Sequence, residues 1–580
     1  MTAGASDHVV TSLRALHAGL TRARLPLEVP GAVEARERAR AAAVQLADYV
    51  IPRAEQFEAP LLAVVGGSTG AGKSTLVNSL VGQEVSRASA IRPTTRRPVL
   101  VHHPDDAGWF LDERVLPSLA RVHGTAEQTD PAGHVTELEL VAADRVPRGL
   151  ALLDAPDIDS VVVANRQLAG QLLAAADLWI FLTTAARYAD AVPWALLRGA
   201  AARRAVVAVV LDRVPPGTAP EVRADLSERL HAEDLAHAPL FVISEQQRTA
   251  DGAAIVLPDA DLAPVLAWLH GLADDAVTRA AVARQTLTGA IEEVLAGAQD
   301  VAGAVREQDE AMARLRAAAT ESHAAAVEAV MVATEDGTLL RGEVLARWQE
   351  FVGTGEWLRG VEAAIGRLRD RIGGVLRGRP STQVRAAEAI ESGLVTLVVA
   401  QLERAMQETR DRWQSLPGGP GALSALPHRN AAEDRPELAR RVEGEVRDWQ
   451  RALLERVRSE GEDRRTRARM LSLGVNASGI TLMLVVFALS GGLTGLEVGV
   501  AGGTAVVGQK VLEMVFGDQA VRDLARHAQR DLQSRVDRLL EEHREPWLAR
   551  LAELDAERVA AEEIDRAATA VRSAVAEAQR

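Results

Sequence analysis

The sequence predicts a mixed α/β domain inserted in a long α-helical stalk or bundle, which also carries an apolar helical hairpin. Three observations predict this fold class. Short apolar runs alternate with helical or polar segments between residues 58 and 272, and helical periodicity follows residue 272. Residues 470–509 then carry a single charge, Glu497. The 580 residues leave room for about three to four structural units.

The composition excludes several classes of protein. With 47% hydrophobic residues, 25% charged residues and a net charge of -14, the chain has the composition of a folded protein and an acidic balance that disfavours nucleic acid as a partner. The absence of cysteine excludes disulfides, thiol nucleophiles and thiolate metal sites. The N-terminus has neither a basic region nor an apolar region, so we expect no cleaved signal peptide.

Residues 1–57 predict N-terminal helices that pack on the stalk, because Val9, Leu13, Leu16 and Leu20 have helical spacing. Residues 58–272 form the predicted α/β domain. Its expected strands lie in the apolar runs LLAVVGG, RPVLV, TELELVA, LALLDAP, LWIFLTT, AVVAVVL and LFVIS.

Residues 273–469 predict long bundle or coiled-coil helices. Apolar residues follow heptad spacing there, with Gln308 as the one interruption: Leu287, Ile291, Val294, Ala298, Val301, Val305, Met312 and Leu315. The Pro- and Gly-rich residues 415–427 predict an interhelix loop or hinge. Residues 516–580 are charged and periodic again, which predicts a returning C-terminal stalk helix.

The strongest motif follows the first expected strand and fits the P-loop pattern GxxxxGK[ST]. Its glycines let the backbone wrap a phosphate, and the amides of residues 70–74 can donate to it at the positive end of a helix. We expect Lys73 to bridge the β- and γ-phosphates and the Ser74 hydroxyl to ligate Mg²⁺. The expected nucleotide-binding residues of this segment are Gly67, Ser68, Thr69, Gly70, Ala71, Gly72, Lys73, Ser74 and Thr75.

Two further motifs resemble those of the dynamin superfamily. Residues 92–98, RPTTRRP, resemble the Thr-Arg-Arg-Pro motif of its first switch, which implies that Thr95 binds Mg²⁺. Residues 154–157 resemble its DxPG motif, which implies that Asp154 holds Mg²⁺ through water. Asp157 stands where the family has glycine, so its carboxylate should repel the γ-phosphate unless it points away or meets a cation.

Guanine recognition resembles the family less well. After the strand at 206–210 the family has Asn or Thr, Lys, any residue and Asp, whereas this chain has Asp212, Arg213, Val214 and Pro215. Arg213 can stack on a base, but the carboxylate that accepts from guanine is missing at Pro215. Ser244 resembles the final loop motif of GTPases, so Asp212, Arg213 and Ser244 complete the expected nucleotide site.

Hydrolysis requires a positioned water and charge neutralisation. Small Ras-like GTPases have glutamine where this chain has Ile158, and the dynamin P-loop glutamine and serine correspond to Thr69 and Gly70. No catalytic base is visible in the sequence, so we expect slow intrinsic turnover, with Lys73 and Thr95 as the catalytic residues.

The nearly uncharged segment, residues 470–515, predicts a membrane hairpin of two passes. Arginines before it and basic residues after it predict that both ends stay on the cytoplasmic side of the cell membrane. In dynamin-like proteins with a membrane tip, such a hydrophobic element lies between two halves of a helical stalk. The alternative interpretation is a buried hairpin in the core of the bundle.

The resemblance implies a bacterial dynamin-like protein, with an α/β P-loop GTPase domain that binds and hydrolyses GTP with Mg²⁺ to drive self-assembly and membrane remodelling or repair. Its implied partners are membrane lipid and either further copies of the chain or a dynamin-like partner. Two alternatives remain open: a membrane-anchored, nucleotide-dependent switch that recruits partners, and a P-loop enzyme that uses ATP.

Overall fold

A computed structural model gives the fold of the chain as two compact units. The first unit comprises residues 1–25, 31–307 and 557–580, and the second comprises residues 26–30 and 308–556. The structure describes residues 3–86, 97–112, 114–122, 137–158, 163–246, 257–335, 382–424, 426, 431–460, 480–481, 484–485, 512–556 and 558–580.

The first unit contains an eight-stranded sheet in the order β3-β4-β2-β5-β1-β6-β7-β8. The described strands pair in parallel except β2 and β5, which are antiparallel. Their bounds are β1 Leu61–Gly67, β2 Val99–His102, β3 Ala120–Val122, β4 Glu137–Ala142, β5 Leu150–Asp154, β6 Leu178–Thr184, β7 Val206–Val214 and β8 Leu240–Ser244. This arrangement confirms the α/β domain that the sequence predicts.

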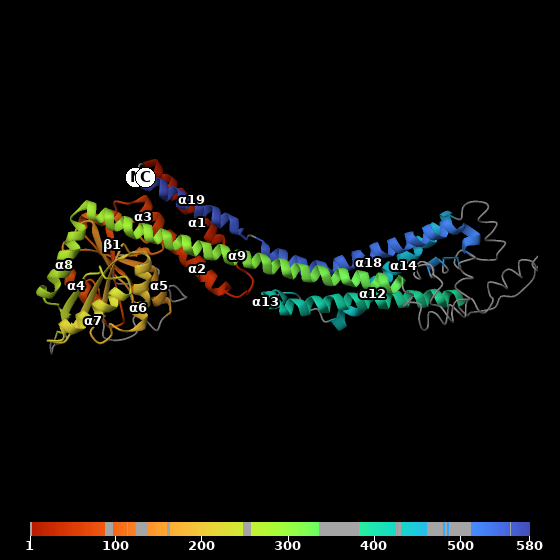
Figure 1. The fold of residues 1–580 in the computed structure, drawn as a ribbon, viewed down its shortest axis with the longest axis horizontal. Helices are drawn as coiled ribbons and strands as arrows, with labels where there is room; N and C mark the ends of the chain where they lie inside the picture. The colour runs from red at the N-terminus through yellow and green to blue at the C-terminus, as the bar shows by residue number, and fades with distance from the viewer. Residues whose placement is uncertain are drawn as a thin grey trace, which may run out of the picture. The chain divides into compact units, whose positions relative to one another are not determined.

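Both faces of the sheet are covered, as continuous apolar strands require. Alternate residues of β1 belong to different hydrophobic clusters: Leu62 and Val64 to one, Leu61 and Val65 to the other. The first cluster includes apolar residues of α5 (Val163–Ala174), α6 (Ala191–Ala202) and α7 (Ala219–Ala232). The second includes those of α4 (Lys73–Val81) and α8 (Asp259–Ala273), which places these helices on opposite sides of the sheet (Figure 1).

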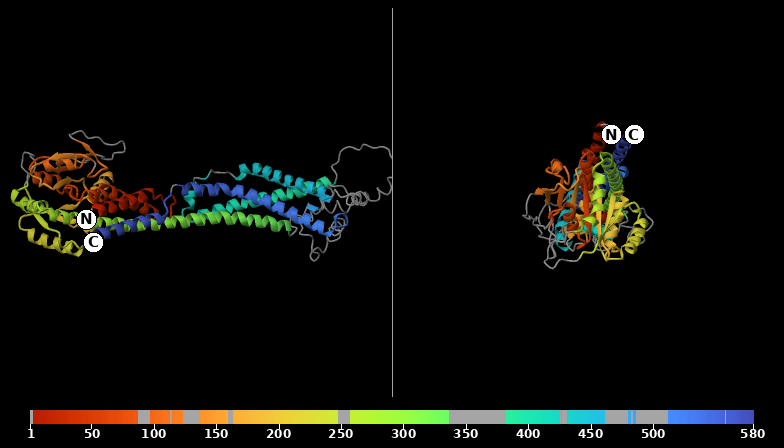
Figure 2. Two further views of the ribbon diagram at one scale, coloured as in Figure 1. Left: turned by 90° about the horizontal axis from the view of Figure 1, so that it is seen from above. Right: turned by 90° about the vertical axis from the view of Figure 1, so that its left-hand side faces the viewer.

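The two ends of the chain meet in the first unit. Helix α1 (Ala3–Arg22) packs along α19 (Ala561–Gln579), and the two termini lie next to each other (Figure 2). Arg22 forms an ion pair with Glu563 across this contact. The other N-terminal helices, α2 (Ala32–Gln45), η1 (Leu46–Val50) and α3 (Ile51–Glu55), also belong to this unit.

A buried polar cluster joins these N-terminal helices to the sheet. Asp177, just before β6, is fully buried and forms an ion pair with Arg53 of α3. It also accepts hydrogen bonds from the Tyr49 hydroxyl at 2.9 Å and the Leu62 amide at 2.7 Å. Its backbone carbonyl accepts from the Thr286 hydroxyl of α9 (Ala276–Glu335) at 2.8 Å. One aspartate therefore ties four elements, α3, η1, β1 and α9, to the start of β6.

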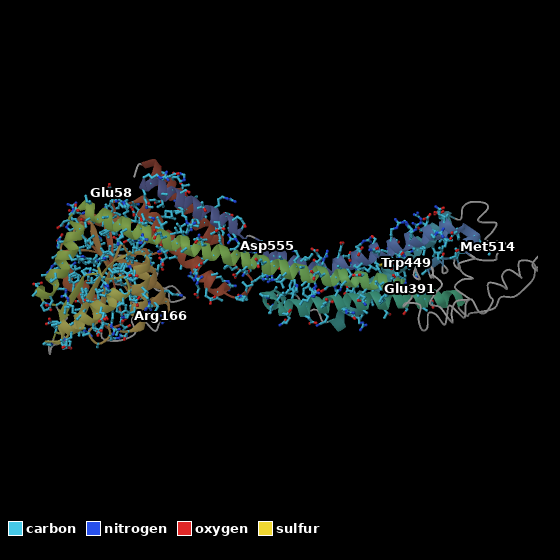
Figure 3. The ribbon with its side chains drawn as sticks, viewed as in Figure 1. Glu58, Arg166, Glu391, Trp449, Met514 and Asp555 are labelled. Carbon is cyan, nitrogen blue, oxygen red and sulfur yellow. The ribbon has the colours of Figure 1, made fainter. Side chains whose placement is uncertain are left out.

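The second unit is helical and is built from the rest of α9 with α12 (Thr382–Ser415), α13 (Gly419–Ser424), α14 (Ala431–Glu460) and α18 (Asp518–Asp555). Tryptophans fix the contacts between these helices. Trp449 of α14, labelled in Figure 3, donates its indole N–H to the Ala528 carbonyl of α18 at 2.8 Å. Trp413 donates to Leu315 at 2.9 Å and packs edge-on against Trp547, with ring centroids 5.0 Å apart.

Gln308, which interrupts the heptad pattern, has a structural partner. Its side chain is fully buried, accepts from the Leu27 amide at 2.9 Å and donates to the Leu27 carbonyl at 2.8 Å. The polar residue therefore satisfies both backbone groups of a chain segment that has no helix or strand to satisfy them.

The helices differ from the predicted layout at two points. Between residues 415 and 427, where the sequence predicts a loop, the short helix α13 begins after a turn that contains Gly418 with φ 77°. The single returning helix expected over 516–580 is two helices, α18 and α19, because Ala556 has the extended dihedrals φ -60° and ψ 134°. The second of these helices belongs to the first unit.

Most of the expected membrane hairpin, residues 470–515, lies outside the described residues. Among its described positions, Ile480, Leu484 and Leu512 are buried in the hydrophobic cluster of the second unit. None of the helices that the structure describes has enough apolar length to span a bilayer.

Candidate functional site

The P-loop connects β1 to α4, as the motif predicts. Gly70 and Gly72 have φ of 75° and 103°, in the left-handed region that side chains rarely adopt. Gly67 approaches a neighbouring strand, so that a Cβ there would lie 2.2 Å from the Leu182 carbonyl oxygen. Local geometry therefore favours glycine at all three of these positions.

Lys73, the first residue of α4, is turned back over the loop. Its Nζ donates to the carbonyl oxygens of Gly67 at 2.9 Å and Ser68 at 3.2 Å. It also forms an ion pair with Asp157, and its side chain is only 6% exposed. Of the two outcomes expected for Asp157, the structure gives the one in which the carboxylate meets a cation.

Asp154 at the end of β5 holds two hydroxyl groups. Its Oδ2 accepts from the Ser74 hydroxyl at 2.7 Å and from the Ser86 hydroxyl at 2.6 Å. Its Oδ1 is buried and has no hydrogen-bond partner among the described residues. A buried, unpartnered carboxylate oxygen beside a serine hydroxyl suits a hard cation such as Mg²⁺, either directly or through water. The donor set therefore fits the predicted metal.

Ser86 is a site residue that the sequence does not reveal. Asn78 of α4 holds it by accepting from the Ser86 amide at 3.0 Å and donating to the Ser86 carbonyl at 2.7 Å. No motif includes either residue, and only the fold shows that the chain returns to Asp154 at this point.

Thr95, the predicted switch threonine, lies outside the described residues. Arg97, from the same motif, has a side chain that is 7% exposed and pairs with Glu137 of β4 at 2.6 Å. This end of the motif therefore anchors the segment that leads into β2.

The residues expected to meet the base lie at the ends of β7 and β8. The Asp212 carboxylate accepts from the Arg213 amide at 2.8 Å, and burial raises its pKa. It lies against the P-loop, since a Cβ on Gly72 would be 2.9 Å from its Oδ2. Arg213 is half exposed with φ 54°, and the Ser244 amide donates to Asp261 at 3.1 Å.

A second cation reaches the P-loop from a turn that the sequence analysis does not single out. Arg187, three residues past the end of β6, donates its Nη1 to the Thr69 carbonyl at 3.2 Å. Its Nε pairs with Asp190 at 2.8 Å. The structure thus brings together the P-loop, Asp154 and Asp212, and it adds Ser86 and Arg187.

A glycine-rich loop between a strand and a helix, a lysine folded over it and an aspartate at the end of the adjacent strand define a P-loop nucleoside triphosphatase. Residues 62–198 match the family model described as the dynamin family. The matched segment therefore belongs to a GTPase domain of the dynamin family.

Bacterial dynamins are among the solved structures that match this chain at low TM-scores. One is described as an oligomerised bacterial dynamin pair for the long-range sensing and tethering of membranes. It is 10% identical to this chain, the match covers 93% of this chain and 95% of that chain, and the TM-score is 0.42. LeoA, a bacterial dynamin GTPase from ETEC, is 11% identical with 99% and 98% coverage and a TM-score of 0.23.

Toc33 from Arabidopsis thaliana, in complex with GDP and Mg²⁺, is 15% identical, covers 46% of this chain and 96% of that chain, and has a TM-score of 0.22. A search of curated protein sequences finds no significant match.

Proposed function

We propose that this protein binds GTP with Mg²⁺ and hydrolyses it to drive self-assembly and the remodelling or repair of a membrane. The observation that carries the nucleotide part is the meeting of Lys73, Ser74 and Asp154 at the end of the P-loop. A bound Mg²⁺ would neutralise phosphate charge and orient the triphosphate.

Each residue has a defined task in this proposal. Lys73 would exchange Asp157 for phosphate oxygens, and the Ser74 hydroxyl and the unpartnered oxygen of Asp154 would hold the metal, the aspartate through water. The switch residue Thr95 would be a ligand of the metal only when a γ-phosphate is bound. The backbone amides of residues 70–74 complete the phosphate site at the N-terminus of α4.

We assign GTP as the nucleotide on the family match and on the half-exposed Arg213, which can stack on a base. Asp212, whose carboxylate accepts from the Arg213 amide, and Ser244 at the end of the adjacent strand β8 are the other residues we assign to the base site. One observation favours ATP as the alternative: Pro215 replaces the carboxylate that reads guanine.

Competition of GTP and ATP against a fluorescent guanine nucleotide tests both assignments. We expect GTP to compete at lower concentration than ATP. We expect Lys73→Ala to abolish binding of either triphosphate while the variant keeps the circular dichroism spectrum of the folded wild type. Unchanged affinity in the Lys73→Ala variant would refute the P-loop assignment, and preferential competition by ATP would refute the choice of base.

The membrane part of the proposal rests on residues 470–515, whose length and flanking arginines suit a hairpin with both flanks on the cytoplasmic side of the cell membrane. Membrane lipid and further copies of the chain, or a dynamin-like partner, are the proposed partners. A membrane-anchored switch that recruits proteins without reshaping lipid is the alternative, and it predicts no liposome deformation.

Deletion of residues 470–515 tests the membrane assignment. We expect the variant that lacks these residues to be released from carbonate-washed membranes and still to bind nucleotide. The full chain should remain in the membranes. A full-length protein that is monomeric without detergent would instead identify the segment as a buried hairpin of the bundle. Electron microscopy of liposomes with GTP then separates remodelling from recruitment.

A further inference from the structure

The turn that follows β6 is held rigidly beside the P-loop. The Ala185 amide donates to the Asp212 carbonyl at 3.2 Å, and the Arg187 and Tyr188 amides donate to the Thr184 carbonyl at 3.0 and 2.9 Å. The Tyr188 hydroxyl donates to Asp225 of α7 at 2.7 Å. Strand β6 itself pairs with β1 up to Gly67, so this turn and the P-loop start side by side.

Two cations hold three successive carbonyl groups of the P-loop. Lys73 binds the carbonyls of Gly67 and Ser68 from the helix side, and Arg187 binds that of Thr69 at 3.2 Å from the β6 side. Each cation also has an aspartate partner, Asp157 for Lys73 and Asp190 for Arg187. The Arg187 side chain is 43% exposed, so it has room to move.

Hydrolysis of a triphosphate places extra negative charge on the oxygens around the γ-phosphorus, and a positioned guanidinium can neutralise it. This chain has Thr69 and Gly70 where the dynamin P-loop has glutamine and serine. It also has the apolar Ile158 where Ras-like GTPases have glutamine. A planar guanidinium with five donors can keep the Thr69 carbonyl and still reach a phosphate oxygen, whereas an ammonium offers no such fork.

We propose that Arg187 is a catalytic residue that acts on the nucleotide bound to its own chain. In the transition state its guanidinium leaves Asp190 and binds the γ-phosphoryl oxygens. The attacking water forms its bond to the γ-phosphorus as the bond from that phosphorus to the β–γ bridging oxygen breaks. GDP leaves with the electron pair, and the proton of the water passes to the phosphate product. This inference rests on the proposed GTPase function.

The test compares Arg187→Ala, Arg187→Gln and Arg187→Lys with the control Arg198→Ala. Arg198 is an exposed arginine of α6 that pairs with Glu233 at 3.0 Å. The main measurement is the affinity for fluorescent GDP with Mg²⁺, with and without aluminium fluoride, which mimics the transferring phosphoryl group. Turnover of GTP is measured alongside.

We expect the control to behave as wild type and all Arg187 variants to bind GDP within about twofold of it. In Arg187→Ala and Arg187→Gln, the gain in GDP affinity on adding aluminium fluoride should be smaller than in wild type by about tenfold or more. The kcat for GTP should fall about 10²- to 10³-fold. Arg187→Lys keeps the positive charge but not the paired donors of the guanidinium. It should therefore lose part of the gain from aluminium fluoride and part of kcat.

Unimpaired capture of aluminium fluoride by the variants, with normal GDP binding, would overturn this inference alone. An equal loss of GDP affinity would make Arg187 a support of the P-loop instead. Arg187→Ala protein can also be mixed with Lys73→Ala protein, which keeps Arg187. If this mixture binds aluminium fluoride with GDP as wild type does, the arginine acts between chains and the intrachain role is wrong. Wild-type protein without GDP affinity would refute the proposed function as well.

Discussion

Replacing Asp157 with asparagine should tighten nucleotide binding, because this carboxylate occupies the cation that a phosphate needs. Lys73 is nearly buried and donates to three acceptors in this structure: two P-loop carbonyls and Asp157. A triphosphate has to displace the carboxylate before it gains the lysine. The asparagine side chain has a similar shape but no charge, so it competes less well.

The size of the effect follows from the environment of the pair. A hydrogen bond to a charged group contributes about 1.5 to 3 kcal/mol. Asp157 is 36% exposed, so water screens the pair, and the lower end of this range is appropriate. We therefore expect GTP affinity to rise about tenfold. GDP affinity should rise less, because Asp157 repels the γ-phosphate in addition to competing for Lys73.

Equilibrium titration of fluorescent GTP and GDP analogues at fixed Mg²⁺ and salt measures both affinities. Asp144→Asn is the matched control, since it removes an equal charge from an exposed position near the opposite end of β5. Unchanged or weaker GTP binding in Asp157→Asn would refute the reasoning, as would an equal gain for GTP and GDP.

Two further predictions concern stability. Asp177→Asn leaves the buried Arg53 without its anion and should lower the free energy of unfolding by about 3 kcal/mol, measured by urea unfolding, whereas Asp300→Asn breaks the exposed pair with Arg38 and should cost about 1 kcal/mol or less. Burial lowers the pKa of His323 to about 4, with His543 and Arg544 nearby, so its contribution to stability is complete above the ordinary pKa of 6.5 and is lost as pH falls towards 4. By pH 5 we expect the helical unit to lose about 1 to 2 kcal/mol, and His323→Leu to lose less over the same range; an equal pH dependence in both proteins would contradict this assignment.

Local patterns predict the P-loop and the strands because these depend on short stretches of sequence. All seven apolar runs form strands, and the P-loop lies where its motif places it. The three-residue strand β3 is missed because it is short and partly exposed, with no apolar alternation. The antiparallel pairing of β2 with β5 is also missed, since strand order depends on contacts across the whole domain.

The remaining site residues depend on tertiary contacts that no motif records. Ser86 reaches Asp154 only because Asn78 folds the chain back onto α4. Asp157 is visible in the sequence as a departure from a family pattern, but its ion pair with Lys73 is a property of the fold. Gln308 interrupts a heptad pattern because a distant backbone segment needs its amide.

Strand β6 connects the nucleotide site to the helices of the same unit. The fully buried strand begins next to Asp177, which binds Arg53 and Tyr49 of the N-terminal helices and, through its carbonyl, Thr286 of α9. It ends at the turn that presents Arg187 to the P-loop. A buried strand paired on both sides cannot shift at one end alone, because each residue is held by its neighbours. A change in the Arg187 turn on nucleotide binding would therefore act on the same strand that carries the anchor of α9 in this unit.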